Sequence, residues 1–333
     1  MIRLPLHRRS AAALAFAALL ALPLASQLMA QTDVPAAPQQ APDAAAAAPA
    51  GPVFPKADPA DFTADSPTKE QVNAFLQASW GYDTNRLFQI QRIAKTTVPG
   101  VSNVVILAGE KGNKQVQGLQ FFVLPDGKHI VTAGEILPFS DHPYLENRAA
   151  LIKRADGPSL GAPSKDLELV EFADFQCPHC KEAQPTMEKL AKDFPTAHIV
   201  YESFPLVKIH DQAFRAAAYG TCVAKLGGNT AFFQFSAAVY EGQAGLATPE
   251  GATLTLNSAV TKSGQDPDKV EACSKTPETK AAVEANIKLA GDLNVNQTPS
   301  LAINGRLIPL GGIDYNTLKE IISYHLANDG AAK

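Results

Sequence analysis

Ten residues decide the fold, and they read Glu171-Phe172-Ala173-Asp174-Phe175-Gln176-Cys177-Pro178-His179-Cys180. The apolar run 167–172, which overlaps their start, predicts a strand, and apolar residues at helical spacing from Met187 to Phe194 predict a helix after them. The two cysteines therefore stand where a strand passes into a helix. At a helix N-terminus, unpaired N–H groups and the helix dipole favour a thiolate over a thiol. The stretch predicts redox chemistry.

The four residues of the Cys-x-x-Cys motif have distinct expected roles. Cys177 lies at the helix start, so we expect it to be the exposed, acidic thiol that attacks. Cys180 lies one turn further on, so we expect it to be more buried and to resolve the mixed disulfide. Pro178 suits the first helical turn, where its missing N–H is not needed. His179 adds positive charge beside the thiolate, which lowers the pKa of the thiol and makes the disulfide a stronger oxidant.

Other chemistries of a Cys-x-x-Cys motif have sequence requirements of their own. A c-type haem site needs His directly after the second cysteine, where Lys181 stands. A zinc site needs a second close pair, but the remaining cysteines, Cys222 and Cys273, stand alone and far apart. A purely structural disulfide would leave the strand-to-helix placement unused. An exposed surface histidine is the alternative for His179. We expect no cofactor and no metal.

Length and composition favour a folded, exported protein of two domains. The chain has 333 residues, of which 46% are hydrophobic and 19% charged, so a packed core is expected. A net charge of −4 offers no electrostatic footprint for nucleic acid. Residues 1–30 are typical of a signal peptide, with an arginine-containing start, an apolar run at 11–24 and a cleavage site at 28–30. We expect a periplasmic or otherwise exported protein, in which disulfides persist. The alternative is an uncleaved signal anchor.

The chain ahead of the motif divides at composition changes. Residues 31–65 are rich in Ala and Pro and predict a flexible linker. Residues 66–155 predict a small α+β domain in which we see no set of catalytic residues. We expect this domain to position the protein or to mediate its association. There, Ser66 as N-cap and Pro67 at the first helical position predict a helix to about Trp80. Further predicted elements are strands at 101–107, 118–124 and 129–131 and a helix at 144–154, while 87–95 is ambiguous between helix and strand.

The second domain, at 165–330, has the order of a βαβ unit, a helical block and a ββα unit. After the strand at 167–172 and the motif helix, residues 198–204 predict a strand. A helical block covers about 211–293. Strands at 300–303 and 306–310, joined by an Asn-Gly turn, precede a helix at 315–327.

Residues 165–327 resemble the DsbA-like branch of the thioredoxin superfamily. The resemblance depends on separated pieces, which are Val170-Glu171-Phe172, Cys177-Pro178-His179-Cys180, Phe204-Pro205-Leu206 with Ile209-His210, the helical block, and Thr298-Pro299-Ser300 with Asn304-Gly305. It implies an α/β fold, namely a thioredoxin fold with a helical insertion, here preceded by the small α+β domain.

The resemblance also implies roles for residues outside the motif. Pro299 matches the cis-proline that faces the active-site disulfide and places the Thr298 backbone beside Cys177, where a client can pair as an added strand. Glu171 matches a buried acid beneath Cys180, where a raised pKa would let it relay a proton. The alternatives are an ordinary trans proline and a surface glutamate.

Two further features follow from resemblance alone. Some DsbA-like proteins carry a second disulfide in the helical insertion, which implies a structural bridge between Cys222 and Cys273, with two free buried thiols as the alternative. Residues 121–137 are similar to the end of the small dimerisation domain of DsbC/DsbG-type isomerases, which implies a homodimer through the N-terminal domain.

The leading hypothesis is an exported thiol:disulfide oxidoreductase that forms disulfides in client proteins through Cys177 and Cys180. Its clients would be unfolded or misoxidised exported proteins, and a membrane or soluble redox partner would reset it. One alternative is a dimeric disulfide isomerase or reductase. Another is a client-binding chaperone with secondary redox activity.

Overall fold

The computed structural model describes residues 51–132 and 135–330. The predicted signal peptide, 1–30, and most of the predicted linker lie outside the described residues. Within the described ranges, no helix is both long and apolar enough to cross a bilayer.

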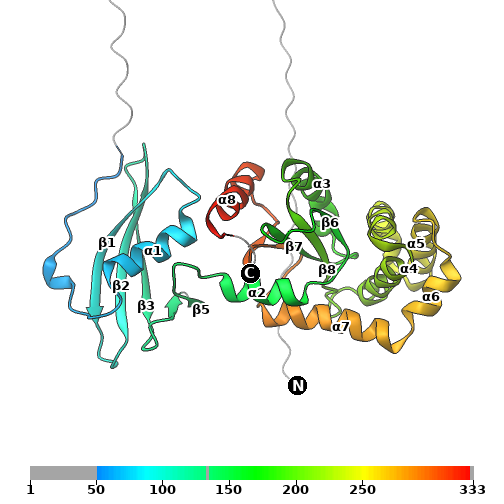
Figure 1. The fold of residues 1–333 in the computed structure, drawn as a ribbon, viewed down its shortest axis with the longest axis horizontal. Coiled ribbons are helices and arrows are strands. Elements are labelled where there is room, and N and C mark those ends of the chain that lie inside the picture. Colours follow the sequence, from blue (N-terminus) through cyan, green and yellow to red (C-terminus); the bar gives the residue numbers. More distant parts are fainter. Residues whose placement is uncertain (1–50, 133–134, 331–333) are drawn as a thin grey trace, which may run out of the picture. The chain divides into compact units, whose positions relative to one another are not determined.

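The small domain is one antiparallel sheet with a helix against it (Figure 1). Its strands follow one another in sequence order, and the segment that was ambiguous at 87–95 is the first of them. The elements are α1 (Lys69–Trp80), β1 (Arg86–Lys95), β2 (Ser102–Glu110), β3 (Val116–Val123), β4 (His129–Thr132) and β5 (Glu135–Pro138). Val72, Phe75 and Leu76 of α1 are buried against the sheet. Their spacing is that of one helical face, so one side of the sheet holds the core of this domain.

The start of α1 differs from the prediction. Thr68 is the N-cap, not Ser66, and the helix begins at Lys69 after Pro67. The Thr68 hydroxyl accepts the N–H of Gln71, and the Gln71 side chain accepts the N–H of Thr68. This reciprocal capping box satisfies two N–H groups, which Ser66 could not do from two residues earlier.

The described part of the predicted linker contacts the small domain. The N–H groups of Thr63 and Ala64 donate to the carbonyl of Ile93, and Phe62 forms a bridge with that strand residue. The segment includes a short 3-10 helix, η1 (Pro59–Asp61). The linker predicted for 31–65 therefore ends in residues that line the edge of β1.

The second sheet has the order β10-β9-β7-β8-β6. β7 and β8 are parallel, and the other pairs are antiparallel. The strands are β6 (Ser159–Gly161), β7 (Glu168–Ala173), β8 (His198–Ser203), β9 (Ser300–Ile303) and β10 (Arg306–Pro309). β6 was not predicted, since its three residues lie within a Gly- and Pro-rich segment.

Helices cover both faces of this sheet (Figure 1). Leu169 packs with α3 (Pro178–Asp193) and α8 (Tyr315–Asn328) on one face. Val170 and Phe172 pack with α2 (Leu145–Arg154) and α7 (Pro277–Asp292) on the other. Because successive strand residues face opposite sides, Glu171 shares the α3 face with Leu169. This is the thioredoxin fold expected from the sequence.

The helical insertion lies between β8 and β9. It contains α4 (Ala213–Glu241), the 3-10 helix η2 (Gln243–Ala247), α5 (Pro249–Lys262), α6 (Pro267–Ser274) and α7. The predicted helical block begins with α4, which is interrupted at Gly228, whose φ of 73° suits glycine. Phe175, from the active-site loop, stacks on Tyr201 and meets the edge of Phe235. The insertion and the active-site loop therefore share one aromatic core.

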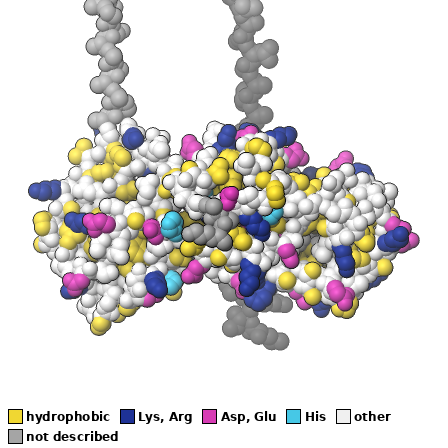
Figure 2. All heavy atoms as spheres, viewed as in Figure 1, with side chains coloured by type: hydrophobic (Ala, Val, Ile, Leu, Met, Phe, Trp, Pro, Cys, Tyr) yellow, Lys and Arg dark blue, Asp and Glu magenta, His cyan; other side chains and the backbone are white. Residues whose placement is uncertain are grey.

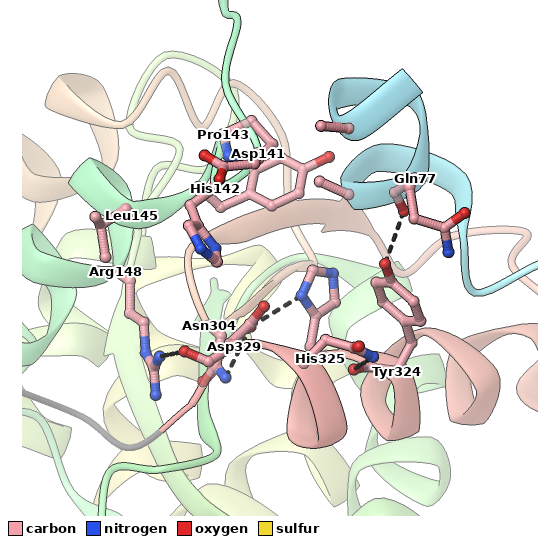
Figure 3. Close-up of a pocket in the computed structure, with 14 residues that line it drawn as sticks. Gln77, Asp141, His142, Pro143, Leu145, Arg148, Asn304, Tyr324, His325 and Asp329 are labelled. Atoms are coloured by element: carbon pink, nitrogen blue, oxygen red, sulfur yellow. Dashed lines mark hydrogen bonds and ion pairs between the residues drawn. The ribbon is translucent and has the colours of Figure 1, made fainter. Parts of the chain in front are cut away.

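Helix α2, which was predicted as the end of the small domain, is anchored to the second sheet. Arg148 is buried and donates to the carbonyl of Asp329 (Figure 3). It also donates to the carbonyl of Asp166. Asn304 donates to the Asp329 carboxylate, which also binds His325. These bonds join α2 to the β9–β10 turn and the end of α8, so α2 packs with the domain that follows it.

Candidate active site

Cys177 and Cys180 lie at the junction of β7 and α3, as predicted. Cys177 is the N-cap of α3, and Pro178 occupies the first turn. Both thiols are free. Cys180 is fully buried, but Cys177 is only 5% exposed, so the prediction of an exposed nucleophile is wrong. The Thr298 carbonyl, 3.6 Å from the Cys177 sulfur, belongs to the loop that helps to cover it.

The two thiols differ strongly in acidity. Hydrogen bonding with Cys180 lowers the pKa of Cys177 to about 5, although burial acts in the opposite direction. Contacts with Thr298 and the N–H groups of Cys180 and His179 lower the pKa further. Burial raises the pKa of Cys180 far above the ordinary value of a thiol, and the Cys177 sulfur adds to the rise. At neutral pH, Cys177 is therefore a thiolate and Cys180 a thiol.

The ring of His179 pairs with a neighbouring glutamate on α3. Its ring is well exposed, and Nδ1 lies 2.9 Å from Oε2 of Glu182. The hydrogen bond and charge of Glu182, followed by the charge of Cys177, raise the pKa of His179. Its backbone N–H lowers the pKa of Cys177, and the attraction between the protonated ring and the Cys177 sulfur also favours the thiolate.

Glu171 lies in the position expected for the buried acid. It is 4% exposed, and burial raises its pKa to about 7. Gln184, on α3, opposes this rise, because its side chain lies 3.4 Å from Glu171 Oε1. The same Gln184 nitrogen donates to the carbonyl of Cys180 at 3.0 Å. Sequence reasoning missed Gln184, although its place one helical turn after Cys180 was a usable signal.

The loop before β9 forms the second side of the site. The Thr298–Pro299 peptide bond is cis. The two residues line a groove beside the motif, together with His179, Thr186 and Gln297. Thr298, which lines this groove, also contacts Cys177, although the two residues are 121 positions apart in sequence.

Gln243, at the start of η2, fastens the insertion to the active-site loop. Its side-chain nitrogen donates to the carbonyls of Phe175 and Cys177, each at 2.8 Å. In the opposite direction, Gln176 donates to the carbonyl of Leu246. No sequence signal pointed to Gln243, since its partners are more than sixty residues away.

A disulfide joins Cys222 in α4 to Cys273 in α6, 51 residues apart. This is the pairing that the resemblance implied. Among the described residues, no group of three His, Cys, Asp or Glu side chains is placed to hold a metal ion.

Comparisons with known proteins relate this chain to one family. A family model described as Thioredoxin matches residues 153–323, just over half of the chain. Disulfide bond formation protein D of Bacillus subtilis is 28% identical over 174 residues, which cover 51% of this chain and 77% of that protein. The Na(+)/H(+) antiporter NhaA 3 of Salinispora tropica is 33% identical over 67 residues. That match covers 20% of this chain, which spans only about a tenth of the antiporter's length.

Solved structures similar to this chain include two bacterial proteins. A periplasmic thioredoxin-like protein from Salmonella enterica serovar Typhimurium is 24% identical, with a TM-score of 0.46, and the match covers 55% of this chain and 97% of that one. BdbD from Bacillus subtilis is 22% identical, with a TM-score of 0.44, and the match covers 52% and 94% of the two chains.

Proposed function

This chain belongs to the thioredoxin family, and we propose that it is an exported thiol:disulfide oxidoreductase that forms disulfide bonds in client proteins. The observation that carries the proposal is the difference in acidity between Cys177, with a pKa of about 5, and Cys180, whose pKa is raised by burial. A stable Cys177 thiolate stabilises the reduced form, which makes the disulfide form a strong oxidant. This supports transfer of the disulfide from this protein to its clients.

In the proposed reaction, a client thiolate attacks Cys177 of the disulfide form. A bond forms between the client sulfur and Cys177, and the electron pair of the broken disulfide goes to Cys180. A second client thiolate then attacks the client sulfur, so Cys177 leaves as a thiolate and the client leaves with a disulfide. The carboxyl group of Glu171, whose pKa is about 7, supplies the proton that Cys180 takes up.

The groove beside Thr298 and Pro299 would hold the client chain. Its walls offer polar groups from Gln297 and Thr186 as well as backbone. Unfolded or misoxidised exported proteins, whose backbones are free to pair as an extra strand, fit such a site. A membrane or soluble redox partner would restore the disulfide. On the face shown in Figure 2, Lys and Arg are interspersed with Asp and Glu, which supports a protein client over nucleic acid.

The test uses the full-length, oxidised protein with reduced, unfolded ribonuclease. We expect the wild type to regenerate ribonuclease activity, Cys177→Ser to abolish turnover, and Cys180→Ser to accumulate mixed disulfides visible on non-reducing gels. The matched control is Cys222→Ser with Cys273→Ser, which removes the other cysteine pair and should leave turnover intact. Full activity of Cys177→Ser would refute the mechanism.

Disulfide isomerisation by a homodimer is the second candidate function. It is favoured by apolar side chains that the small domain leaves exposed on β3 and β5, where Leu119 and Phe122 are more than a third exposed and Ile136 is 65% exposed. Such side chains are suited to an interface with a second copy. Recovery of scrambled ribonuclease, compared with oxidation of the reduced enzyme, distinguishes the two functions.

A further inference from the structure

Asp174, which directly follows β7, contacts the buried cysteine through its backbone. Its N–H points at the Sγ atom of Cys180, at 3.4 Å. Both thiols are free in this structure, so Cys180 has the covalent state that it reaches once the disulfide has been broken. The Asp174 N–H is therefore seen beside the sulfur that receives the electron pair.

Cys180 needs such a donor. It is fully buried, so water cannot stabilise negative charge on its sulfur. Burial is the main cause of its raised pKa, and the Asp174 N–H acts against that rise. A donor aimed at a site where charge develops, in a place without water, is among the strongest means by which proteins stabilise transition states.

Hydrogen bonds also fix the side chain of Asp174. The residue is 2% exposed. Its Oδ1 accepts the N–H of Gln176 at 2.8 Å. Its Oδ2 accepts the N–H of Leu206 at 2.8 Å and Nδ1 of His210 at 2.7 Å. A buried carboxylate is retained only with several good partners, and two of these three come from the β8–α4 connection, more than thirty residues away.

His210 is the one side chain among these partners, and its place is itself fixed. Its own N–H donates to the carbonyl of Leu206 at 3.0 Å. The imidazole therefore ties the β8–α4 connection to the loop that precedes Cys177. Losing it would leave the Asp174 carboxylate buried with only backbone donors, and the loop would shift to find water.

We infer that the peptide N–H of Asp174 is a catalytic donor to the departing Cys180 sulfur, and that His210 is the positioning residue that keeps this N–H aimed. This inference rests on the proposed thiol–disulfide exchange. It concerns the step in which an attacking thiolate bonds to Cys177 Sγ, the disulfide breaks and its electron pair moves to Cys180 Sγ. It does not concern the later step, in which Cys177 is the leaving group.

The two steps can be measured separately with glutathione as the thiol. In the first measurement, reduced glutathione attacks the oxidised full-length protein, and mixed-disulfide formation is followed by acid quench and mass spectrometry. In the second, glutathione releases Cys177 from its glutathione mixed disulfide in a Cys180→Ser background. We expect His210→Leu to slow the first step about tenfold, the typical effect of one hydrogen bond to a charged group, and to change the second less than about twofold.

Two further variants test whether the effect on the first step is specific to the His210 hydrogen bond. His210→Asn places an amide donor near the position of Nδ1 and should restore most of the first-step rate. His198→Leu is the matched control, because His198 is similarly buried and lies beside another buried acid, Glu168, at the opposite end of β8. It should change neither step. If His210→Leu does not fold, as judged by thermal unfolding, Asp174→Asn must show the same selective loss.

An equal fall of both steps in His210→Leu, an unchanged first step, or an Asn variant no better than the Leu variant would overturn the inference. Glutathione is not a client protein. A wild type that exchanges with glutathione but does not oxidise ribonuclease would therefore refute the proposed function, and the glutathione rates alone would decide the roles of Asp174 and His210.

Discussion

Two glutamates on adjacent strands of the second sheet are buried with raised pKa values, yet only one faces the thiols. Glu171 lies on the α3 side with Cys180, and burial raises its pKa to about 7. Burial also raises the pKa of Glu202 to about 8, but its side chain accepts the N–H of Gly157 in the segment between α2 and β6. Comparing the two glutamates therefore separates the effect of burial on the pKa of an acid from the proton-relay role proposed for Glu171.

Replacing Glu171 should make the protein more stable at alkaline pH and should slow thiol–disulfide exchange. Because its pKa is raised from 4.5 to about 7, the native state keeps a proton that the unfolded chain has lost. The free energy of unfolding therefore falls as pH rises from about 4.5 to about 7 and stays lower above that. Glu171→Gln should remove this fall, a gain of about 3 kcal/mol at pH 8, measurable by urea unfolding at pH 5 and pH 8.

Thiol–disulfide exchange should slow by on the order of 100-fold near pH 7 in Glu171→Gln, because Cys180 loses its proton donor. Glu202→Gln is the matched control. It also removes a buried charge, so it should stabilise the protein at alkaline pH, but its exchange rate should equal that of the wild type. A Glu171→Gln protein with a wild-type exchange rate would contradict the proton-relay role.

At the scale of elements, the helical insertion supports the active-site loop. Gln243 binds the carbonyls on either side of Gln176, and Phe175 reaches into the aromatic core of the insertion. The Cys222–Cys273 disulfide connects α4 to α6 within the same insertion. The loop that carries the nucleophile is therefore held from outside the sheet as well as by it.

Removal of this disulfide should weaken the fold while sparing the motif. The bridge closes a loop of about fifty residues, and such a cross-link is worth about 2–4 kcal/mol in the free energy of unfolding. Cys222→Ser with Cys273→Ser should show that loss in guanidinium unfolding. Cys177 should still react with iodoacetamide with a midpoint near pH 5, the value set by its own contacts. A large upward shift of that midpoint would mean that the bridge controls the site.

At the scale of the whole molecule, the residues of the site all belong to the thioredoxin-fold domain. Helix α2 also packs with this domain, through Arg148 and through Leu151, which is buried beside Val170. A shortened protein should therefore begin before α2, and not at residue 156, where the composition alone would place the boundary.

Deletion of residues 31–140 should leave oxidation of reduced ribonuclease close to the full-length rate, because the site and the groove remain complete. If the small domain dimerises the protein, light scattering should show a dimer that becomes a monomer on deletion, and recovery of scrambled ribonuclease should fall. Loss of oxidation in a folded, shortened protein would contradict the oxidase proposal. A monomeric full-length protein would exclude the dimeric isomerase.

The sequence alone predicted most elements of this protein and its reactive pair. Periodicity and turn residues are local signals, so the strands at 167–172 and 300–303 and the helical block at 211–293 were found close to their observed positions. The Cys-x-x-Cys motif is equally local, because two thiols one helical turn apart are neighbours in any helix. Resemblance added Glu171, Thr298 and Pro299 from outside the motif.

Only the tertiary structure decided how accessible Cys177 is and what surrounds it. Its burial depends on the Thr298 loop, and the cap of α1 depends on the reciprocal hydrogen bonds of Thr68 and Gln71. The roles of Gln243 and His210 depend on contacts across 30 to 70 residues. Such contacts form only when the chain closes around its core. Their hydrogen bonds satisfy buried polar groups whose positions no local pattern records.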